Sequence, residues 1–229
     1  MQYTLIGSIM PAVQIEFDEA GEKMISQAGG MLYMTEGVEM DTDTSDSLLK
    51  GIGRIFAGQS LFLANYTAEK AGDKMAFASN VAGQILPVNV SDHSLIIQKG
   101  AFLCAEAGVQ LETVFQKKAA AGFFGGEGFI LQKISGEGMC FLAIDGDKIM
   151  MDLAEGETIR IQTGNVVAFE ESVTYDIEAV KGMKNIFFAG EGIFMTKLTG
   201  PGRVVIQTLN VSEFASEIST YIPTSTSSS

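Results

Sequence analysis

Three stretches of this chain align with one another, and this internal repeat constrains the fold more than any other feature of the sequence. The first matching block spans residues 25–42, 96–113 and 161–177. A second, glycine-rich block spans residues 56–63, 124–131 and 188–195. One unit of roughly 65–70 residues is therefore written three times, and a fixed period of this kind is typical of repeat architectures.

Residues that recur in all three copies are interpreted as architecture. The repeat motif comprises Gly29, Gly100, Gly164, Phe56, Phe124, Phe188, Gly58, Gly126 and Gly190. A glutamine also recurs, as Gln27, Gln98 and Gln162. A catalytic site is usually one asymmetric cluster, whereas a repeat supplies the same surface three times. The repeat therefore indicates no catalytic residue, and we predict that the protein is not an enzyme.

Strand-like segments make up most of the chain. The 26 glycines fall between short apolar runs and prolines number four, a distribution typical of many strands joined by tight turns. Residues 129–134 and 139–144 are expected to form a hairpin, and residues 193–198 and 203–208 repeat it. The first copy has the same pair with a longer connection, which hairpin tips tolerate.

Apolar patterning separates two kinds of strand. Residues 139–144 are apolar on both faces and should be covered on both sides, whereas residues 174–180 alternate and should have one wet face. The mixture predicts an all-β fold of three pseudo-repeated β-sandwich units around a pseudo-threefold axis, with short helices. We expect a single domain at residues 1–222, a C-terminal helix within it at about residues 210–218, and a disordered tail at 223–229. The three units are expected at about residues 1–80, 81–145 and 146–209.

Two segments have the apolar spacing of amphipathic helices. Ser45–Phe56 carries such a stripe, although two internal glycines weaken the prediction. Asn210–Ile218 carries another, and Asn210 followed by Glu213 resembles a capping box. The stripe of this second helix consists of Val211, Phe214, Ala215 and Ile218. We expect it to dock on the sheets rather than on a partner or a membrane.

Charge and cysteine content exclude several classes of protein. The 15 Lys and Arg against 28 Asp and Glu give a net charge of −13, so a nucleic-acid partner is not expected. Cys104 and Cys140 lie in apolar runs and are interpreted as buried thiols of a reduced, cytoplasmic protein. The N-terminus lacks Lys and Arg over residues 1–17 and is interpreted as a first strand rather than a signal peptide. No apolar run reaches the roughly 18 residues of a transmembrane helix.

No short motif that carries chemistry is complete. His93 is the only histidine and cannot supply the ligand set of a metal enzyme, so it is interpreted as a turn residue. Residues 41–46 begin like a calcium loop, but Asp46 and Ile52 stand where that loop needs glycine and glutamate. Glycine-rich residues 122–128 lack the Gly-Lys-Ser/Thr of a nucleotide loop. They are interpreted as structural, or as part of a groove formed by three equivalent turns; no metal or cofactor is assigned.

Three glycine-rich signatures in order carry a family resemblance: LLKGIGRIFAGQSLFLANYTA, GFFGGEGFILQKISGEG and FFAGEGIFMTKLTGPGRVVIQTLNVSEFASEI. With them the chain resembles the AIM (altered inheritance of mitochondria) family of bacterial, archaeal and fungal proteins over about Met1 to Ile222. The resemblance implies a β-sandwich like the subunit of the tryptophan RNA-binding attenuation protein, present three times per chain, and a ring-like assembly. It implies no established activity for bacterial members, whereas fungal members are associated with the mitochondrial inner membrane. Without an Arg-rich transit segment, the chain is expected to be a prokaryotic, cytoplasmic member.

Three functions remain open at this point. The first is a non-enzymatic scaffold that forms homo-oligomers through exposed strand edges and recruits protein partners. The second is a small-ligand-binding protein with a pocket between β units, by analogy with the attenuation protein. The third is an enzyme of unrecognised type, built from carboxylates that meet only in space. The three copies and the incomplete motifs favour the scaffold.

Overall fold

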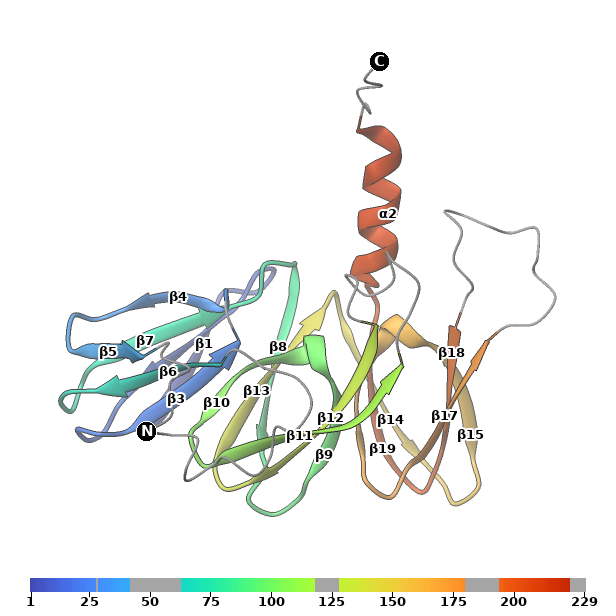
Figure 1. Ribbon diagram of the computed structural model, residues 1–229, viewed down its shortest axis with the longest axis horizontal. Coiled ribbons are helices and arrows are strands. Elements are labelled where there is room, and N and C mark those ends of the chain that lie inside the picture. Colours follow the sequence, from blue (N-terminus) through green and yellow to red (C-terminus); the bar gives the residue numbers. More distant parts are fainter. Residues whose placement is uncertain (28, 42–62, 118–127, 180–193, 223–229) are drawn as a thin grey trace.

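The computed structural model of the protein describes residues 1–27, 29–41, 63–117, 128–179 and 194–222, and its strands form four sheets (Figure 1). The first sheet runs in the order β1 (Gln2–Ile6), β2 (Ala12–Glu16), β7 (Lys74–Ala78) and β4 (Met31–Met34). The fourth runs in the order β15 (Thr158–Gln162), β18 (Phe194–Thr199) and β17 (Thr174–Ala179). All of the strand pairs in these two sheets are antiparallel.

Two six-stranded sheets lie between them. The second sheet runs in the order β5 (Val38–Asp41), β6 (Leu63–Ala68), β3 (Lys23–Gln27), β10 (Phe102–Glu106), β13 (Met139–Asp145) and β8 (Gly83–Asn89). The third runs in the order β11 (Val109–Lys117), β12 (Phe129–Gly136), β9 (Leu95–Gln98), β16 (Val166–Glu170), β19 (Gly202–Gln207) and β14 (Lys148–Leu153). Place for place, each strand number in the third sheet exceeds its counterpart in the second by six. The two sheets therefore have the same connectivity.

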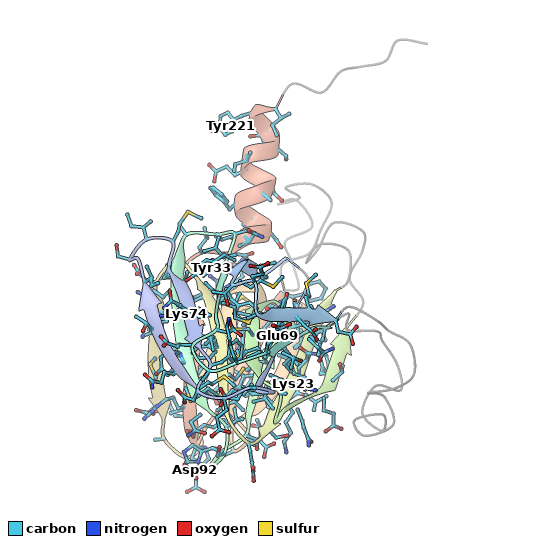
Figure 2. All side chains as sticks on the ribbon, turned by 90° about the vertical axis from the view of Figure 1, so that its left-hand side faces the viewer. Lys23, Tyr33, Glu69, Lys74, Asp92 and Tyr221 are labelled. Carbon is cyan, nitrogen blue, oxygen red and sulfur yellow. The ribbon has the colours of Figure 1, made fainter. Side chains whose placement is uncertain are left out.

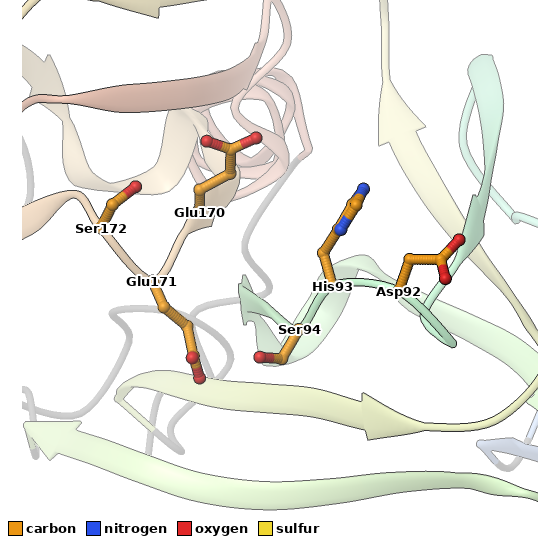
Figure 3. A pocket seen from close by; sticks show the side chains of 6 residues that line it. All are labelled: Asp92, His93, Ser94, Glu170, Glu171 and Ser172. Carbon is orange, nitrogen blue, oxygen red and sulfur yellow. The ribbon is translucent and has the colours of Figure 1, made fainter.

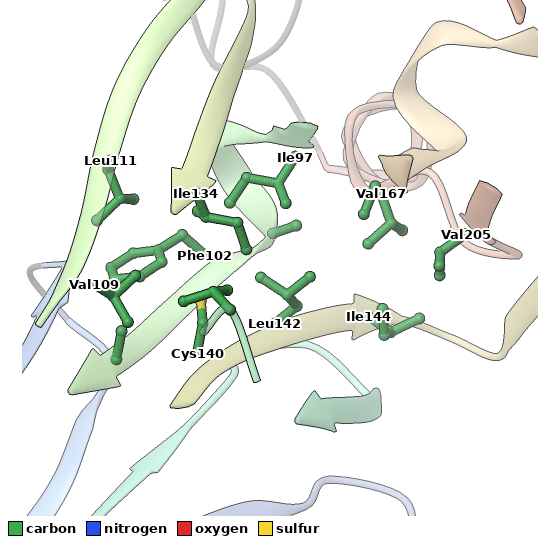
Figure 4. Close-up of a cluster of buried hydrophobic side chains, with 14 of the residues drawn as sticks. Ile97, Phe102, Val109, Leu111, Ile134, Cys140, Leu142, Ile144, Val167 and Val205 are labelled. Atoms are coloured by element: carbon green, nitrogen blue, oxygen red, sulfur yellow. The ribbon is translucent and has the colours of Figure 1, made fainter. Parts of the chain in front are cut away.

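Three hydrophobic clusters fill the spaces between successive sheets. One joins the first and second sheets around Phe77 and Phe141. Another joins the second and third sheets around Ile97 and Leu142 (Figure 4). The last joins the third and fourth sheets around Phe169 and Leu198. β13 of the second sheet contributes to the clusters on both of its sides, so residues 140–144 are buried, and the prediction that residues 139–144 are covered on both faces is confirmed.

The all-β prediction is confirmed, but the predicted hairpins are wrong. β12 and β13 are consecutive strands, yet β12 lies in the third sheet and β13 in the second. The pairs β6–β7 and β18–β19 are separated between two sheets in the same way. Turn residues specify that the chain reverses, but not whether the two strands share hydrogen bonds. Strands that are apolar on both faces need a layer on each side, so the chain crosses between layers at these turns.

The C-terminal helix begins where the sequence predicts and ends later. The side chain of Asn210 caps α2 (Val211–Tyr221) by accepting hydrogen bonds from the backbone N–H groups of Ser212 and Glu213. The predicted docking of its apolar stripe on the sheets is wrong, because no residue of α2 is buried and the helix projects from the body (Figures 1 and 2). The helix predicted at Ser45–Phe56 and the predicted tail lie outside the described residues.

Two further features bear on the predictions. The N-terminal segment forms two strands, β1 and β2, rather than one. Short 3-10 turns, Lys99–Ala101 and Thr163–Asn165, precede β10 and β16.

In the described part of the chain no helix has the length and apolar character needed to cross a membrane. The pseudo-threefold axis, the likeness to the attenuation protein and the unit boundaries stay predictions.

Candidate functional site

Two open sheet edges, at opposite ends of the molecule, are the strongest candidate for a functional surface. Within the described residues β4 pairs only with β7, and β15 pairs only with β18. Figure 1 shows β4 at one end of the row of sheets and β15 at the other. The unpaired N–H and C=O groups of an edge strand form a template for pairing with another chain.

The strands that correspond to these edges are paired inside the chain. β10 pairs with β3 through Cys104↔Ser26, Ala105↔Ile25 and Glu106↔Met24. β16 pairs with β9 through Ala168↔Ile97, Phe169↔Ile96 and Glu170↔Leu95. In the aligned copies, Gln98 lies 71 positions after Gln27, and Gln162 lies 64 positions after Gln98. Adding 71 to each residue of β3 and 64 to each residue of β10 gives the pairs between β9 and β16. We call each of these two pairings between aligned copies a junction, and the two junctions therefore have the same register.

The same offsets place β4 in line with β10 and β16, and β15 in line with β3 and β9. Burial differs sharply between the paired and open copies. Leu103 and Cys104 of β10 are 5% and 0% exposed, whereas the corresponding Leu32 and Tyr33 of β4 are 58% and 41% exposed. Apolar side chains that are core residues in one copy therefore lie on the surface in another.

The backbone of β4 has the shape that β10 and β16 adopt in their junctions. Each of the three strands has a register shift, or bulge, at the same aligned place where it meets its inner neighbour. At the end of β10 and of β16, and directly after β4, a side chain accepts a hydrogen bond from the first residues of that neighbour. The donor–acceptor pairs are Lys74 N to Thr35 Oγ1 at 3.1 Å, Met139 N to Glu106 Oε2 at 3.1 Å and Arg203 N to Glu170 Oε2 at 3.0 Å. β4 thus meets its inner neighbour in the same way as its two counterparts do.

The recurring glutamines lie at the ends of β3, β9 and β15, and the contacts of Gln27 and Gln162 differ between a paired strand and an open edge. Gln27 donates from Nε2 across the junction to the backbone carbonyl of Lys99 at 3.0 Å. Gln162, at the open edge, instead donates to the carboxylate of Glu213 on α2. A residue that bridges two sheet halves in one copy therefore contacts the C-terminal helix in the last copy.

The repeat glycines are only partly described by the structure. Gly29 has a φ of +93°, which favours glycine. Gly100 and Gly164 stand in the middle of the two 3-10 turns, where an added Cβ would meet the side chains of Gln98 and Asn210 respectively. The remaining motif residues, Phe56, Phe124, Phe188, Gly58, Gly126 and Gly190, lie outside the described residues.

The only histidine lines a shallow surface hollow. His93 lies in the connection between β8 and β9, around a hollow of about 410 Å³ that is also lined by Glu170 at the end of β16 and Glu171 in the turn after it (Figure 3). A hydrogen bond from Lys133, aided by one from Ser94, lowers the pKa of Glu171 below its usual value. Among the described residues no group of three or more His, Cys, Asp or Glu side chains is placed to hold a metal ion. The hollow is therefore lined mainly by carboxylates beside one imidazole.

Both cysteines are free and buried, as predicted. Although β10 and β13 are neighbours, Cys104 faces the cluster between the first and second sheets and Cys140 faces the next one. Burial raises the pKa of both thiols. Thiols that stay protonated are poor nucleophiles and metal ligands, so a structural role fits them better than a chemical one.

One buried polar residue was missed by sequence reasoning. Gln132 of β12 is fully buried, and neither amide atom has a hydrogen-bond partner in the described structure. It pairs with Ile97 of β9, which in turn pairs with Ala168 of β16, so it lies at a junction between sheet halves. The position of Gln132 directly after the apolar Phe129, Ile130 and Leu131 was the signal that could have identified it.

Comparisons with known proteins agree with the resemblance. The model of the mitochondrial biogenesis AIM24 family matches residues 3–209. An uncharacterized protein of Streptococcus pyogenes serotype M6 is 30% identical, over 98% of this chain and 92% of that protein. A crystal structure of a Streptococcus pyogenes protein from structural genomics has a TM-score of 0.76 and 28% identity, covering 96% of this chain and 99% of that one. The chain belongs to the mitochondrial biogenesis AIM24 family.

Proposed function

We propose that this protein is a non-enzymatic scaffold whose copies join head to tail, with β4 of one copy pairing with β15 of the next. The observation that carries this proposal is the common register of the two internal junctions. In this proposal the chain consists of three equivalent β-sandwich units. Two junctions between units form within the chain, and the third forms between chains.

The register of the intermolecular junction follows from the same offsets. Tyr33 is expected opposite Ile161, Met34 opposite Arg160, and Thr35 opposite Ile159. Pairing would cover Leu32 and Tyr33, which are now exposed. Full burial of one large apolar side chain contributes about 1.5–3 kcal/mol, and each new backbone hydrogen bond about 0.5–1.5 kcal/mol.

These gains compete with the cost of association, about 4–15 kcal/mol in lost translational and rotational freedom. One junction of a few hydrogen bonds is therefore weak. Head-to-tail contacts close into a ring when the rotation per copy allows it, and a ring leaves no β4 or β15 edge unpaired. We accordingly propose a closed homo-oligomer rather than a dimer with two open ends.

A charge substitution and its rescue test this arrangement. Met34→Lys places a cation opposite Arg160, whose exposed ion pair with Glu178 (Nε 3.4 Å from Oε2) offsets its charge only weakly. The substitution should dissociate the oligomer, because like charges directly opposite each other destabilise paired strands. Adding Arg160→Glu should restore assembly by creating an opposite-charge pair. Met150→Lys, on the edge strand β14, is the matched control and should leave the mass unchanged.

Molar mass is read by size-exclusion chromatography with light scattering. A wild-type protein that stays a strict monomer refutes the scaffold. Dissociation by Met34→Lys without rescue by Arg160→Glu would instead show that the register is wrong.

A second candidate function is small-ligand binding, favoured by the unpartnered amide of Gln132 at a junction between units. Buried polar groups almost always have partners, and a bound ligand could supply one. A thermal-shift screen with amino acids and common metabolites tests this candidate. A hit that stabilises the wild type and not Gln132→Met would support it, and a screen without hits would refute it.

We also propose that the protein works in the cytoplasm without binding nucleic acid. The two free thiols and the net charge of −13 support this proposal. Cell fractionation tests the location. Binding of RNA that weakens steeply with salt would contradict the second part.

A further inference from the structure

A third open edge lies on β14. The strands equivalent to β14 are not paired across a junction, and each of them has its outer edge protected. Three strands occupy corresponding places next to the bulged rows: β2, β8 and β14. The rows are Gln14↔Ala76↔Tyr33, Pro87↔Phe141↔Cys104 and Met150↔Val205↔Ala168. Gln14, Pro87 and Met150 are therefore equivalent positions on the three strands.

The outer edge of β2 is covered by a strand of the same chain. β1 pairs along it through Thr4↔Gln14, with Tyr3 opposite Ile15 and Leu5 opposite Val13. The ring of Tyr3 packs against that of Phe141, with centroids 5.1 Å apart. The first edge is therefore occupied by an extended segment with apolar side chains at alternate positions.

Proline blocks the outer edge of β8. Pro87 stands inside an unbroken ladder of seven residue pairs with β13, so its nitrogen faces away from β13, where no hydrogen bond is lost. Proline at such a position is a common protection against strand addition, because it removes a donor from the free edge. By equivalence, the N–H of Met150 also points to the free edge, where it is available.

The edge of β14 has neither protection. Among the described residues β14 pairs with β19 alone (Figure 1). Ile149 and Met150 are each 45% exposed, whereas Val13, the equivalent of Ile149 under β1, is fully buried. In the described structure the outer edge of β14 therefore has unpaired backbone N–H groups and exposed apolar side chains, whereas the same edge of the equivalent strand β2 is covered by β1.

We propose that β14 binds an extended segment of a partner protein by antiparallel strand addition. Main-chain hydrogen bonds supply affinity in this mode, and alternate side chains supply specificity. The segment should place apolar side chains opposite Ile149 and Met151, as Leu5 and Tyr3 lie opposite Val13 and Ile15.

Charge around the edge further defines the partner. Asp147 precedes β14, and Glu155 and Glu157 follow it, whereas Lys148, the first residue of β14, is the basic residue of the strand. Asp152 is already held by Arg203, with Nε 2.8 Å from Oδ1. The partner segment should therefore lack acidic residues and carry Lys or Arg beside its apolar core. This site is separate from β4 and β15, so it does not depend on the scaffold proposal.

A fluorescein-labelled peptide, Gln-Tyr-Thr-Leu-Ile between two lysines at each end, is the probe. Binding is followed by anisotropy with the full-length chain carrying Met34→Lys, so that self-assembly through β4 does not enter the measurement. We expect saturable binding that weakens at least tenfold in Met150→Pro. That substitution copies Pro87, so the fold should tolerate it, and an unchanged melting temperature verifies this. Ile149→Lys is a second variant that should weaken binding by repelling the basic peptide.

Three results would overturn the proposal. The first is an absence of saturable binding up to about 1 mM, a concentration at which even a weak complex of about −4 kcal/mol is half formed. The second is binding that Met150→Pro and Ile149→Lys leave unchanged, which would mean that the peptide replaces β1 on β2. The third is a dimer formed through exchanged β1 strands and dissociated by the peptide, which would assign the edge to a second copy.

Discussion

Replacing Gln132 by methionine should stabilise the protein. Gln132 is fully buried in β12, between Thr113 of β11 and Ile97 of β9. Both its Oε1 and Nε2 atoms lack hydrogen-bond partners in the described structure. The folded state therefore bears the cost of removing an amide from water, without the bonds that would normally offset it.

The expected gain follows from two opposing effects. An unsatisfied buried amide costs about 1–3 kcal/mol in protein mutational data. Methionine has a similar length and no polar group, and a swap that conserves volume in a core costs less than about 1.5 kcal/mol. We expect a net stabilisation of about 1–2 kcal/mol. For a chain of this size, that corresponds to an increase in Tm of about 2–8 °C.

Urea denaturation with an unchanged m-value is the assay, supported by thermal melting. Gln110→Met, on the exposed side of β11, is the matched control and should stay within about 0.5 kcal/mol of the wild type. A destabilisation of more than about 1 kcal/mol by Gln132→Met would refute the reasoning. It would mean that the amide has a partner in solution, and it would favour the small-ligand function.

Three further predictions concern backbone packing, pH and thiol reactivity. Gly83→Ala should destabilise the fold by about 3 kcal/mol in urea melts, because an added Cβ would lie 1.8 Å from the carbonyl oxygen of Ile144; a change below about 1 kcal/mol would contradict this. Burial raises the pKa of Asp145 above its ordinary value of 3.8, so its favourable contribution is present below that value and is lost as pH rises through the folded-state pKa. Stability curves from pH 4 to 7 should accordingly be flatter for Asp145→Asn than for the wild type, and a steeper curve would count against the assignment. Cys104 and Cys140 should resist Ellman's reagent in the native state and react fully in urea, and rapid native labelling would contradict their burial.

Local patterns predicted the strands and the start of the helix well. Apolar runs such as residues 139–144 identified strands buried on both faces. Asn210, as a capping residue, identified the start of α2. These features depend on side chains within a few positions of one another. The same patterns could not decide sheet membership, because a turn such as residues 135–138 serves equally for a hairpin and for a crossing between layers.

Exposure was the second quantity that local patterns could not predict. Leu32 and Leu103 occupy aligned places in similar sequences, yet Leu103 lies in a strand with neighbours on both sides, whereas β4, with Leu32, pairs only with β7 among the described residues. β10 is covered by β3 of the preceding copy, but no copy comes before β4 in the sequence. Whether an apolar residue is buried or exposed here therefore depends on whether its copy has a preceding copy to pair with. The stripe of α2 misled for a similar reason, since Phe214 and Ile218 have helical spacing but no described residue covers them.

The shared sheets have a consequence for synthesis on the ribosome. β3 is made early, but its neighbour β10 begins at residue 102, so a nascent chain that ends before that point exposes the edge of β3 and half of the second sheet. The same situation recurs between β9 and β16. As the chain grows, β10 covers the unpaired edge of β3, but the newly made β9 exposes another edge until β16 is made. Incomplete chains can therefore aggregate at each stage. Premature termination at residue 80 or 145 should give insoluble fragments, although each contains a complete copy of the repeated sequence.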